Sequence, residues 1–254
     1  KLARSVSYSS AGTIEFLLDQ DKEFYFLEMN TRIQVEHPVT ELVTGLDIVE
    51  LMVRIASGEK LNLNQSCLKF SGYAIEARIC AESPERDFMP SIGRLIKYCP
   101  PREYNGIRVD SGVIEGSEIS IHYDSMIAKV ISYGKNRQVA IDKLVAALEL
   151  FFVKGVDTNI LFLSAILNNH KFKTAQYSTN FITEEWPDSF VPKNVCLENL
   201  DIIRMVAALV HFSYEKRARL SQKKSLGRLE KEFEVVIDNR VSSVSIETIK
   251  NIFN

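Results

Sequence analysis

Two apolar runs separated by a polar stretch predict a hairpin near the start of the chain. Residues 13–18 form the first run, and residues 24–29 form a second run that is rich in aromatic side chains. The polar residues 19–22 between them are typical of a turn that joins antiparallel strands. We therefore expect two paired strands that lead into the short polar segment 30–37.

A helical pattern follows this polar segment. Pro38 suits the first turn of a helix, and apolar residues then recur at helical spacing as far as about Ser57. Gly45 lies inside the pattern and is a candidate break between two helices, whereas Gly58 is a favourable residue after a helix C-terminus.

The middle of the chain has the pattern of a β-rich region. Pro and Gly residues mark turns between short apolar runs from Gly72 to about Ser132. Five runs are candidate strands: residues 73–80, 95–99, 107–111, 119–121 and 126–132. Two helices are predicted next, over residues 136–152 and 158–167. The first has an apolar face made of Val139, Leu144, Val145, Leu148 and Phe151.

The pattern changes near residue 187, where we place a domain boundary. Residues 200–220 predict a helix that becomes increasingly basic. Residues 232–237 and 241–246 predict a hairpin that turns at residues 238–240. Together these elements indicate an α+β fold.

Composition excludes several classes of protein. Hydrophobic residues make up 46% and charged residues 25% of the 254 positions, as in an ordinary globular protein. A net charge of −2 does not favour nucleic acid or an anionic membrane surface, and no apolar stretch reaches the roughly 18 residues of a membrane span. The cysteines lack metal-ligand spacing, so we expect reduced thiols at Cys67, Cys80, Cys99 and Cys196.

Two carboxylates and an amide occupy matching positions on the predicted hairpin. Glu28 and Asn30 lie two residues apart on the second strand and so share a face. Closure around residues 19–22 would bring Glu15 close to Glu28. Carboxylate and amide oxygens are ligands that Mg²⁺ accepts beside phosphate oxygens. The alternative is that these side chains lie on the solvent face of a hairpin.

Arg32, Gln34 and Glu36 alternate directly after the second predicted strand. In an extended segment they would point the same way. A guanidinium that can grip a planar oxyanion would then lie beside a carboxylate that can act as a general base. A surface ladder of charges is the alternative. Arg78 lies in an otherwise apolar strand and is a third element of the site, unless it forms a structural pair with Glu76.

Residues 26–41 resemble the signature of biotin carboxylases, which belong to the ATP-grasp enzymes. The string reads Phe-Leu-Glu-Met-Asn-Thr-Arg-Ile-Gln-Val-Glu-His-Pro-Val-Thr-Glu. Shorter matches extend the resemblance over about residues 1–186; they are residues 12–16, 76–79, 106–108, 123–126 and 179–181. The resemblance implies an enzyme that uses ATP to activate bicarbonate as carboxyphosphate and then carboxylates biotin.

The resemblance also assigns metal and nucleotide roles to single residues. Glu15 and Glu28 would hold Mg²⁺ or Mn²⁺ against the nucleotide, and Asn30 would contact the second of two metal ions. Leu17 and Phe181 would flank the adenine of ATP.

A second group of residues is assigned to bicarbonate and to catalysis. Gln34 and the backbone of Val35 would hold bicarbonate, and Glu36 would deprotonate it. Arg32 would stabilise the enolate-like biotin or the departing phosphate. Arg78 would bind the bicarbonate or carboxyphosphate oxyanion near biotin.

Three domains follow from the resemblance. Residues 1–70 would be the C-terminal part of an ATP-grasp domain, and residues 71–186 the biotin carboxylase C-terminal domain of sheet and helices. Residues 187–254 would be a truncated connecting domain, the start of a helix-plus-β-barrel unit, because residues 181–190 resemble the alpha subunits of propionyl-CoA carboxylases. Arg108 matches a subunit-interface position of homodimeric members, so it is not counted as catalytic.

Several parts of the family pattern do not occur in this sequence. They are the glycine-rich lid loop, the lysines that contact ATP and bicarbonate, and an Ala-Met-Lys-Met biotin-attachment sequence. We therefore expect a truncated chain, inactive alone, that needs an N-terminal carboxylase half, a separate biotin carrier domain and a carboxyltransferase (beta) subunit. No nucleic-acid or membrane partner is expected, and the location would be the bacterial cytoplasm or the mitochondrial matrix. Residues 1–70 should leave apolar edges exposed.

Two other functions remain open at this point. Another ATP-grasp ligase would share the oxygen ligands, but it would not require the Arg-Ile-Gln-Val-Glu-His-Pro run. A non-catalytic remnant or an interaction module would keep the fold without turnover.

Overall fold

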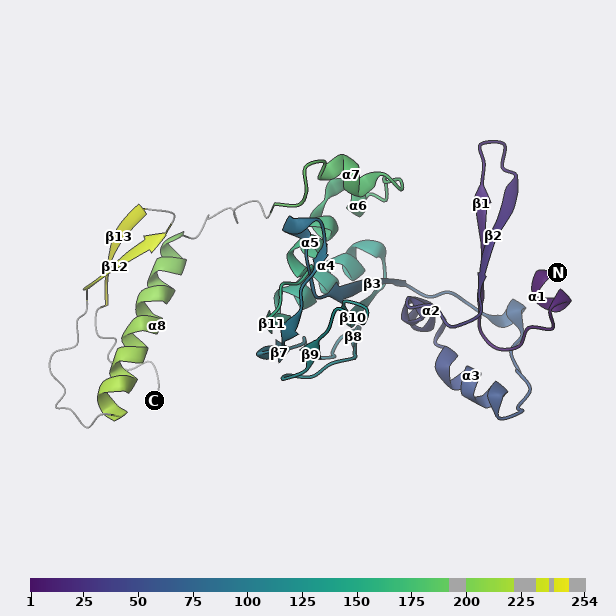
Figure 1. Cartoon of the computed structure of the whole chain (residues 1–254), viewed down its shortest axis with the longest axis horizontal. Coiled ribbons are helices and arrows are strands. Elements are labelled where there is room, and N and C mark those ends of the chain that lie inside the picture. Colours follow the sequence, from purple (N-terminus) through teal and green to yellow (C-terminus); the bar gives the residue numbers. More distant parts are fainter. Residues whose placement is uncertain (192–199, 222–231, 238–239, 247–254) are drawn as a thin grey trace. The chain divides into compact units, whose positions relative to one another are not determined.

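The structure, a computed structural model, describes residues 1–191, 200–221, 232–237 and 240–246. Its contacts divide the chain into two units, Lys1–Pro192 and Lys193–Asn254, and each is described by itself. The mixture of helices and strands confirms the predicted α+β class (Figure 1). The three domain ranges expected from the sequence stay predictions.

The first region of unit 1 contains the hairpin and two helices. In order, its elements are α1 Leu2–Ser5, β1 Thr13–Leu18, β2 Phe24–Asn30, α2 His37–Thr44 and α3 Ile48–Ala56. The hairpin and the break at Gly45 are confirmed. Gly45 has φ 74°, the left-handed conformation that commonly ends a helix. The Asp47 side chain then accepts a hydrogen bond of 2.8 Å from the Glu50 N–H and caps α3.

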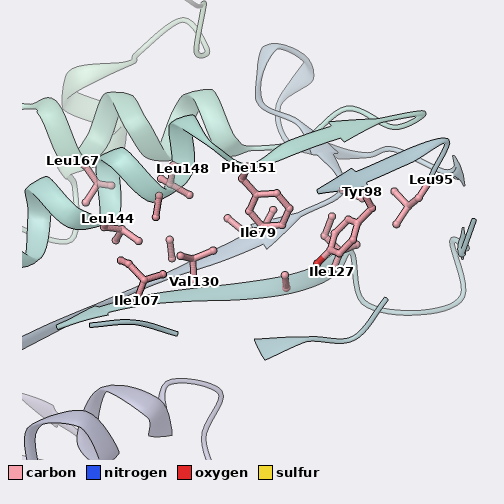
Figure 2. Close-up of a cluster of buried hydrophobic side chains, with 14 of the residues drawn as sticks. Ile79, Leu95, Tyr98, Ile107, Ile127, Val130, Leu144, Leu148, Phe151 and Leu167 are labelled. Atoms are coloured by element: carbon pink, nitrogen blue, oxygen red, sulfur yellow. The ribbon is translucent and has the colours of Figure 1, made fainter. Parts of the chain in front are cut away.

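The largest sheet has the strand order β3–β10–β8 with antiparallel neighbours. Its strands are β3 Tyr73–Cys80, β8 Ile107–Ser111 and β10 Met126–Gly134. α4 Arg137–Glu149 packs on one face, where Leu144 and Leu148 of the helix join Ile79 and Val130 of the sheet in one buried cluster (Figure 2). All four side chains are at most 1% exposed. This cluster is the core of unit 1.

The second face of this sheet lies against α2. The helix contacts β3 and β10, and Ile131, which alternates with Val130 along β10, is fully buried. The sheet is therefore covered on both faces, and α2 brings the polar segment that precedes it up to the charged residues of the sheet.

Short strands and helices complete unit 1. They are the 3₁₀ helices η1 Gln65–Cys67 and η2 Pro84–Arg86, the strands β4 Glu82–Ser83, β5 Met89–Pro90, β6 Gly93–Arg94, β7 Lys97–Cys99, β9 Glu118–Ile119 and β11 Phe152–Lys154, and the helices α5 Ile160–Asn168, α6 His170–Lys173 and α7 Phe181–Glu185.

The predicted helix over residues 136–152 was too long. The helix ends at Glu149, and the strand Phe152–Lys154 pairs with Lys97–Cys99. A long-range strand partner outweighs the helical spacing here. Phe151 is buried as expected, but it lies after the helix and contacts the Tyr98 ring at 5.5 Å. Val139, placed on the buried face by the pattern, is only half-buried.

The thiols agree with the expectation as far as the structure describes them. Cys67, Cys80 and Cys99 are free, and Cys196 lies outside the described residues. Burial, together with the charge of Glu82, raises the pKa of Cys80 to about 11, so this thiol stays protonated near neutral pH.

Unit 2 contains a long helix and a hairpin. α8 Leu200–Ser221 and the strands β12 Glu232–Ile237 and β13 Arg240–Ser245 match the predicted elements. Phe233 of the hairpin contacts the rings of His211 and Phe212 on the helix. The described residues of this unit form no closed barrel. Of the predicted turn 238–240, residues 238–239 lie outside the described residues, and Arg240 is the first residue of β13. No helix in the described part of the chain is long and apolar enough to span a membrane.

Candidate functional site

The hairpin brings its two carboxylates and its amide together. Glu15 and Glu28 are paired positions in the strand register, and Asn30 pairs with Thr13 next to them. The Asn30 side-chain N–H₂ donates to Glu15 Oε1 at 2.8 Å and to Glu28 Oε1 at 2.9 Å. The predicted proximity of Glu15, Glu28 and Asn30 is therefore confirmed.

A bulge separates this polar face from the aromatic side chains of the same strand. The register shifts between Glu15 and Phe16, where the pairing passes over Leu27. An extra residue reverses the alternation of side chains along its strand. Phe26 therefore lies with the ring of Phe16, at 6.2 Å, and not on the face of Glu28.

The oxygens of this face fit a divalent cation. Two carboxylates that are held close together repel each other, and a cation between them would reduce this repulsion. In this structure the N–H₂ group of Asn30 lies between them and donates a hydrogen bond to each. Rotation of that amide would present its oxygen instead, giving three hard oxygen donors. Among the described residues no three His, Cys, Asp or Glu side chains form a metal-binding group.

The segment after the hairpin is not extended, which corrects the prediction from alternation. Residues 32–36 contain a bend and a turn, because the chain must enter α2 at His37. Arg32 curls back and donates from Nη1 to Gln34 Oε1 at 3.0 Å and to the Ile33 carbonyl at 3.1 Å. Arg32, Gln34 and Glu36 still line one hollow of about 300 Å³, together with Gly12 and Thr13 at the base of the hairpin.

Arg78 reaches this segment from the sheet. Its Nη2 donates to Glu36 Oε2 at 2.8 Å, although 42 residues separate the two along the chain. About half of each side chain is exposed, so the contact lies at an accessible surface. The hydrogen-bond partner of Arg78 is thus Glu36. The alternative from the sequence, a structural pair of Arg78 with Glu76, is not what the structure shows.

Glu76 is a buried carboxylate beside this pair. Both of its oxygens are buried and have no hydrogen-bond partner among the described residues. Burial raises the pKa of Glu76 to about 7, although the positive charges of Lys129 and Arg78 oppose this shift. Glu76 therefore changes charge near neutral pH.

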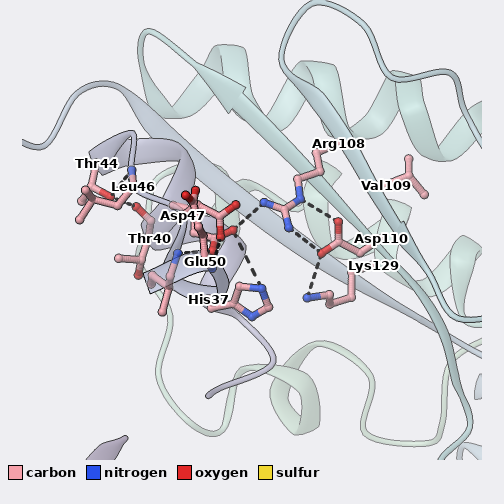
Figure 3. Close-up of polar contacts among 12 residues, drawn as sticks. His37, Thr40, Thr44, Leu46, Asp47, Glu50, Arg108, Val109, Asp110 and Lys129 are labelled. Atoms are coloured by element: carbon pink, nitrogen blue, oxygen red, sulfur yellow. Dashed lines mark hydrogen bonds and ion pairs between the residues drawn. The ribbon is translucent and has the colours of Figure 1, made fainter. Parts of the chain in front are cut away.

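A charged network joins α2 to the sheet (Figure 3). Arg108 donates from Nη1 to Glu41 Oε2 at 2.7 Å and from Nε to Asp110 Oδ1 at 2.7 Å. Lys129 Nζ lies 3.3 Å from Asp110 Oδ2. Burial opposes ionisation of Asp110, but the hydrogen bonds from Arg108 and Lys129 outweigh it and lower its pKa. The resemblance pointed to a subunit interface for Arg108; in this structure its guanidinium binds within the chain.

The two residues expected to flank adenine lie on different elements, Leu17 on β1 and Phe181 on α7, and they differ in burial. Leu17 is 58% exposed on the hairpin. Phe181 is buried, and its ring contacts in the described structure are with Tyr177 at 5.7 Å and Trp186 at 5.9 Å. Their nucleotide role stays a prediction.

Lys129 was missed in the sequence. It is only 9% exposed, and its Nζ donates to the Val35 carbonyl at 2.9 Å. The signal was the same one that singled out Arg78, a lone charge in an apolar strand, here residues 126–134. Glu41, which is 7% exposed on α2, gave no such signal, because its partner Arg108 is far away in the sequence.

Comparison with known proteins agrees with these motifs. The family profile "Biotin carboxylase C-terminal domain" matches residues 76–184, and "Carbamoyl-phosphate synthase L chain, ATP binding domain" matches residues 1–64. The chain belongs to the biotin carboxylase family. The two profiles cover the segment that carries Glu36 and the strand that carries Arg78, and these two side chains meet in the structure.

Individual members of the family are similar over most of the chain. The propionyl-CoA carboxylase alpha chain of Ruegeria pomeroyi is 46% identical over 240 residues, which cover 87% of this chain and 35% of that protein. Biotin carboxylase 1 of Bacillus subtilis is 48% identical over 183 residues, or 72% of this chain and 40% of that protein. This chain therefore spans between a third and two fifths of the length of these relatives.

A solved structure shows the same fold. It is the biotin carboxylase domain dimer of the 2-oxoglutarate carboxylase of Hydrogenobacter thermophilus in complex with MgADP, ADP and bicarbonate. The TM-score is 0.68 at 45% sequence identity, over 72% of this chain and 40% of that chain.

Proposed function

We propose that this chain supplies the metal- and bicarbonate-binding face of an ATP-dependent biotin carboxylase. One observation carries the proposal. The hairpin carboxylates precede a segment whose Arg32, Gln34 and Glu36 line one hollow, and Arg78 reaches Glu36 from the sheet. The bicarbonate and MgADP bound to the Hydrogenobacter domain support the same substrates here.

The hairpin would hold the metal ions. Glu15 and Glu28 would bind Mg²⁺ or Mn²⁺, and Asn30 would offer its amide oxygen to the second ion. Bound metal neutralises charge on the transferring phosphate. Leu17 of the hairpin and Phe181 would flank the adenine ring once the nucleotide is bound.

The segment that follows would bind bicarbonate and move its proton. Gln34 and the backbone N–H of Val35 hold the anion, and Glu36 accepts the proton. Arg78 stabilises the oxyanion beside Glu36, since a guanidinium keeps further N–H donors after one of them has bound the carboxylate. Arg32 stabilises negative charge on biotin or on the departing phosphate.

The whole enzyme would contain more than this chain. An N-terminal carboxylase part would complete the grip on ATP, a carrier domain would bring biotin, and a carboxyltransferase (beta) subunit would take the carboxyl group to propionyl-CoA. The name of the Ruegeria relative supports the choice of acyl-CoA. We expect the chain alone to be inactive.

A chimera tests the proposal without depending on the isolated chain. Residues 1–186 replace the matching part of the Bacillus biotin carboxylase 1, and ATP hydrolysis is measured with Mg²⁺, bicarbonate and free biotin, each omitted in turn. We expect hydrolysis that requires bicarbonate. Glu36→Gln keeps the shape of the side chain and removes the base, so bicarbonate-dependent turnover should fall by roughly 10²- to 10⁴-fold while the KM for ATP changes little.

Glu85→Gln is the matched control. Glu85 is exposed in η2, away from the hollow, so the same chemical change there should leave turnover intact. A Glu36→Gln enzyme with full turnover would exclude Glu36 as the base. A folded wild-type chimera that binds ATP but never responds to bicarbonate would favour a non-catalytic module instead.

A further inference from the structure

Three residues form one row across the largest sheet. Lys129 of β10 is the register partner of Arg78 on β3 and of Asp110 on β8. Residues opposite one another in antiparallel strands lie on the same face. This face lies against α2, so the row meets the segment that carries Val35 and Glu36.

Lys129 is a buried cation with two partners from different parts of the chain. Its Nζ donates to the Val35 carbonyl at 2.9 Å and lies 3.3 Å from Asp110 Oδ2. An ammonium group is costly to bury unless it is paired and hydrogen-bonded. The contact between Lys129 and Asp110 lies within the sheet. The contact between Lys129 and Val35 joins residues 94 apart in the sequence and reaches the segment that we propose binds bicarbonate.

The carbonyl contact is more than a by-product of charge balance. Arg108 already donates two hydrogen bonds to Asp110, at 2.7 Å and 3.0 Å, so that carboxylate has a counter-charge without Lys129. The carbonyl of Val35 has Lys129 as its hydrogen-bond donor. The N–H of the same residue has no acceptor among the described residues and remains available to an anion.

We propose that Lys129 is a positioning residue of the bicarbonate site, which holds the Val35 carbonyl so that the Val35 N–H and the Glu36 carboxylate keep their places. The inference rests on the proposed function, because it assigns bicarbonate to this segment. Two neighbouring side chains of one sheet row thus fix two consecutive residues, Lys129 through the backbone of Val35 and Arg78 through the carboxylate of Glu36.

Hydrogen exchange in the 254-residue chain tests the contact without any catalysis. The His37 N–H is protected by a bond of 3.2 Å to the Gln34 carbonyl, which closes the turn around Val35. In Lys129→Met this turn loses its anchor, and we expect the His37 amide to exchange about tenfold faster, because local opening becomes easier. Lys129→Arg keeps a charged donor and should restore protection to within about twofold.

Lys135→Met is the control, since Lys135 is exposed beyond the end of β10 and the same change there should leave His37 exchange unaltered. Lys129→Gln, whose shorter neutral side chain falls short of the Val35 oxygen, replaces Lys129→Met if that variant does not fold. Unchanged His37 exchange in the folded variant would overturn the proposal.

The chimera supplies the second measurement. We expect Lys129→Met to raise the KM for bicarbonate by about tenfold, to leave the KM for ATP within about twofold, and to be rescued by Lys129→Arg. An equal loss with both substrates, or no change with bicarbonate, would contradict a positioning role. The two proposals can fail separately. If ATP hydrolysis by the wild-type chimera does not depend on bicarbonate, but His37 exchanges faster in Lys129→Met, the proposed function is refuted and the contact between Lys129 and Val35 is supported.

Discussion

The hairpin β1–β2 and the sheet β3–β10–β8 are both built from alternating side chains, but they differ in what covers them. The sheet lies between α4 and α2, and its Ile79, Val130 and Ile131 are fully buried. On the hairpin, Leu18 is 69% and Phe24 is 66% exposed. The expected apolar edges of residues 1–70 are thus present.

The hairpin and the sheet therefore have different roles, because the hairpin carries the proposed metal ligands and the sheet provides the buried core. The hairpin presents Glu15, Glu28 and Asn30 through strand register and one bulge, both of which are local. The sheet contributes burial, and it holds the segment that carries Val35 and Glu36 by contacts that cross large sequence distances. We therefore expect substitutions in the two regions to differ in their effect on unfolding.

The largest effect should come from the core of the sheet. Leu144→Ala removes a fully buried side chain and leaves a cavity, which should lower the free energy of unfolding by about 2–5 kcal/mol. Trp186, the single tryptophan, lies in unit 1, so urea unfolding followed by its fluorescence reports this unit. The midpoint should fall by roughly 1 M or more.

Leu150→Ala is the matched control for this change. Leu150 follows α4 directly and is 58% exposed, so the loss should stay within about 0.5 kcal/mol. Equal losses at Leu144 and Leu150 would show that the core does not lie between α4 and the sheet.

Local signals in the sequence predicted the hairpin well. Two apolar runs, the polar turn at 19–22 and the spacing of Glu28 and Asn30 gave the strands and the proximity of Glu15, and the structure confirms them. The bulge at Leu27 could not be predicted, because no glycine marks it and both runs are apolar on either side of it.

Contacts between distant segments were the part that the sequence could not predict. Spacing suggested Glu76 as the partner of Arg78, whereas folding places Glu36 there. The Glu76 oxygens are buried and have no hydrogen-bond partner in the part of the chain that the structure describes. Alternation suggested an extended segment at 32–36, but entry into α2 imposes a turn. Lys129 lies in the predicted strand, but its hydrogen bond to the Val35 carbonyl joins residues 94 apart and could not be predicted from spacing.

A smaller effect is expected from the buried carboxylate on the covered face of the sheet. The folded chain keeps a proton on Glu76 up to about pH 7, whereas the ordinary pKa is 4.5. The folded state thus binds more protons between these values, and stability falls as the pH rises from 4.5 to 7. Glu76→Gln cannot ionise, so it should stabilise the chain at pH 8 by on the order of 1 kcal/mol, after allowance for solvent screening, and not at pH 4.5.

Urea midpoints at pH 4.5 and pH 8 measure this difference, with Glu85→Gln as the exposed control. The control should show no such pH-dependent gain. A Glu76→Gln variant that is destabilised at pH 8 would mean that the ionised carboxylate has a hydrogen-bond donor in solution and is not an isolated buried charge.

The smallest effect should come from the uncovered hairpin. Leu18→Ser replaces an apolar side chain that is 69% exposed, so the free energy of unfolding of this chain should change by less than about 0.5 kcal/mol. In the Bacillus chimera the same change should cost about 1–2 kcal/mol if the added ATP-grasp part covers the hairpin, because burial of a leucine stabilises by up to about 3 kcal/mol. A loss above about 1 kcal/mol in the chain itself would show that Leu18 is already buried in solution, and the contrast between hairpin and sheet would then fail.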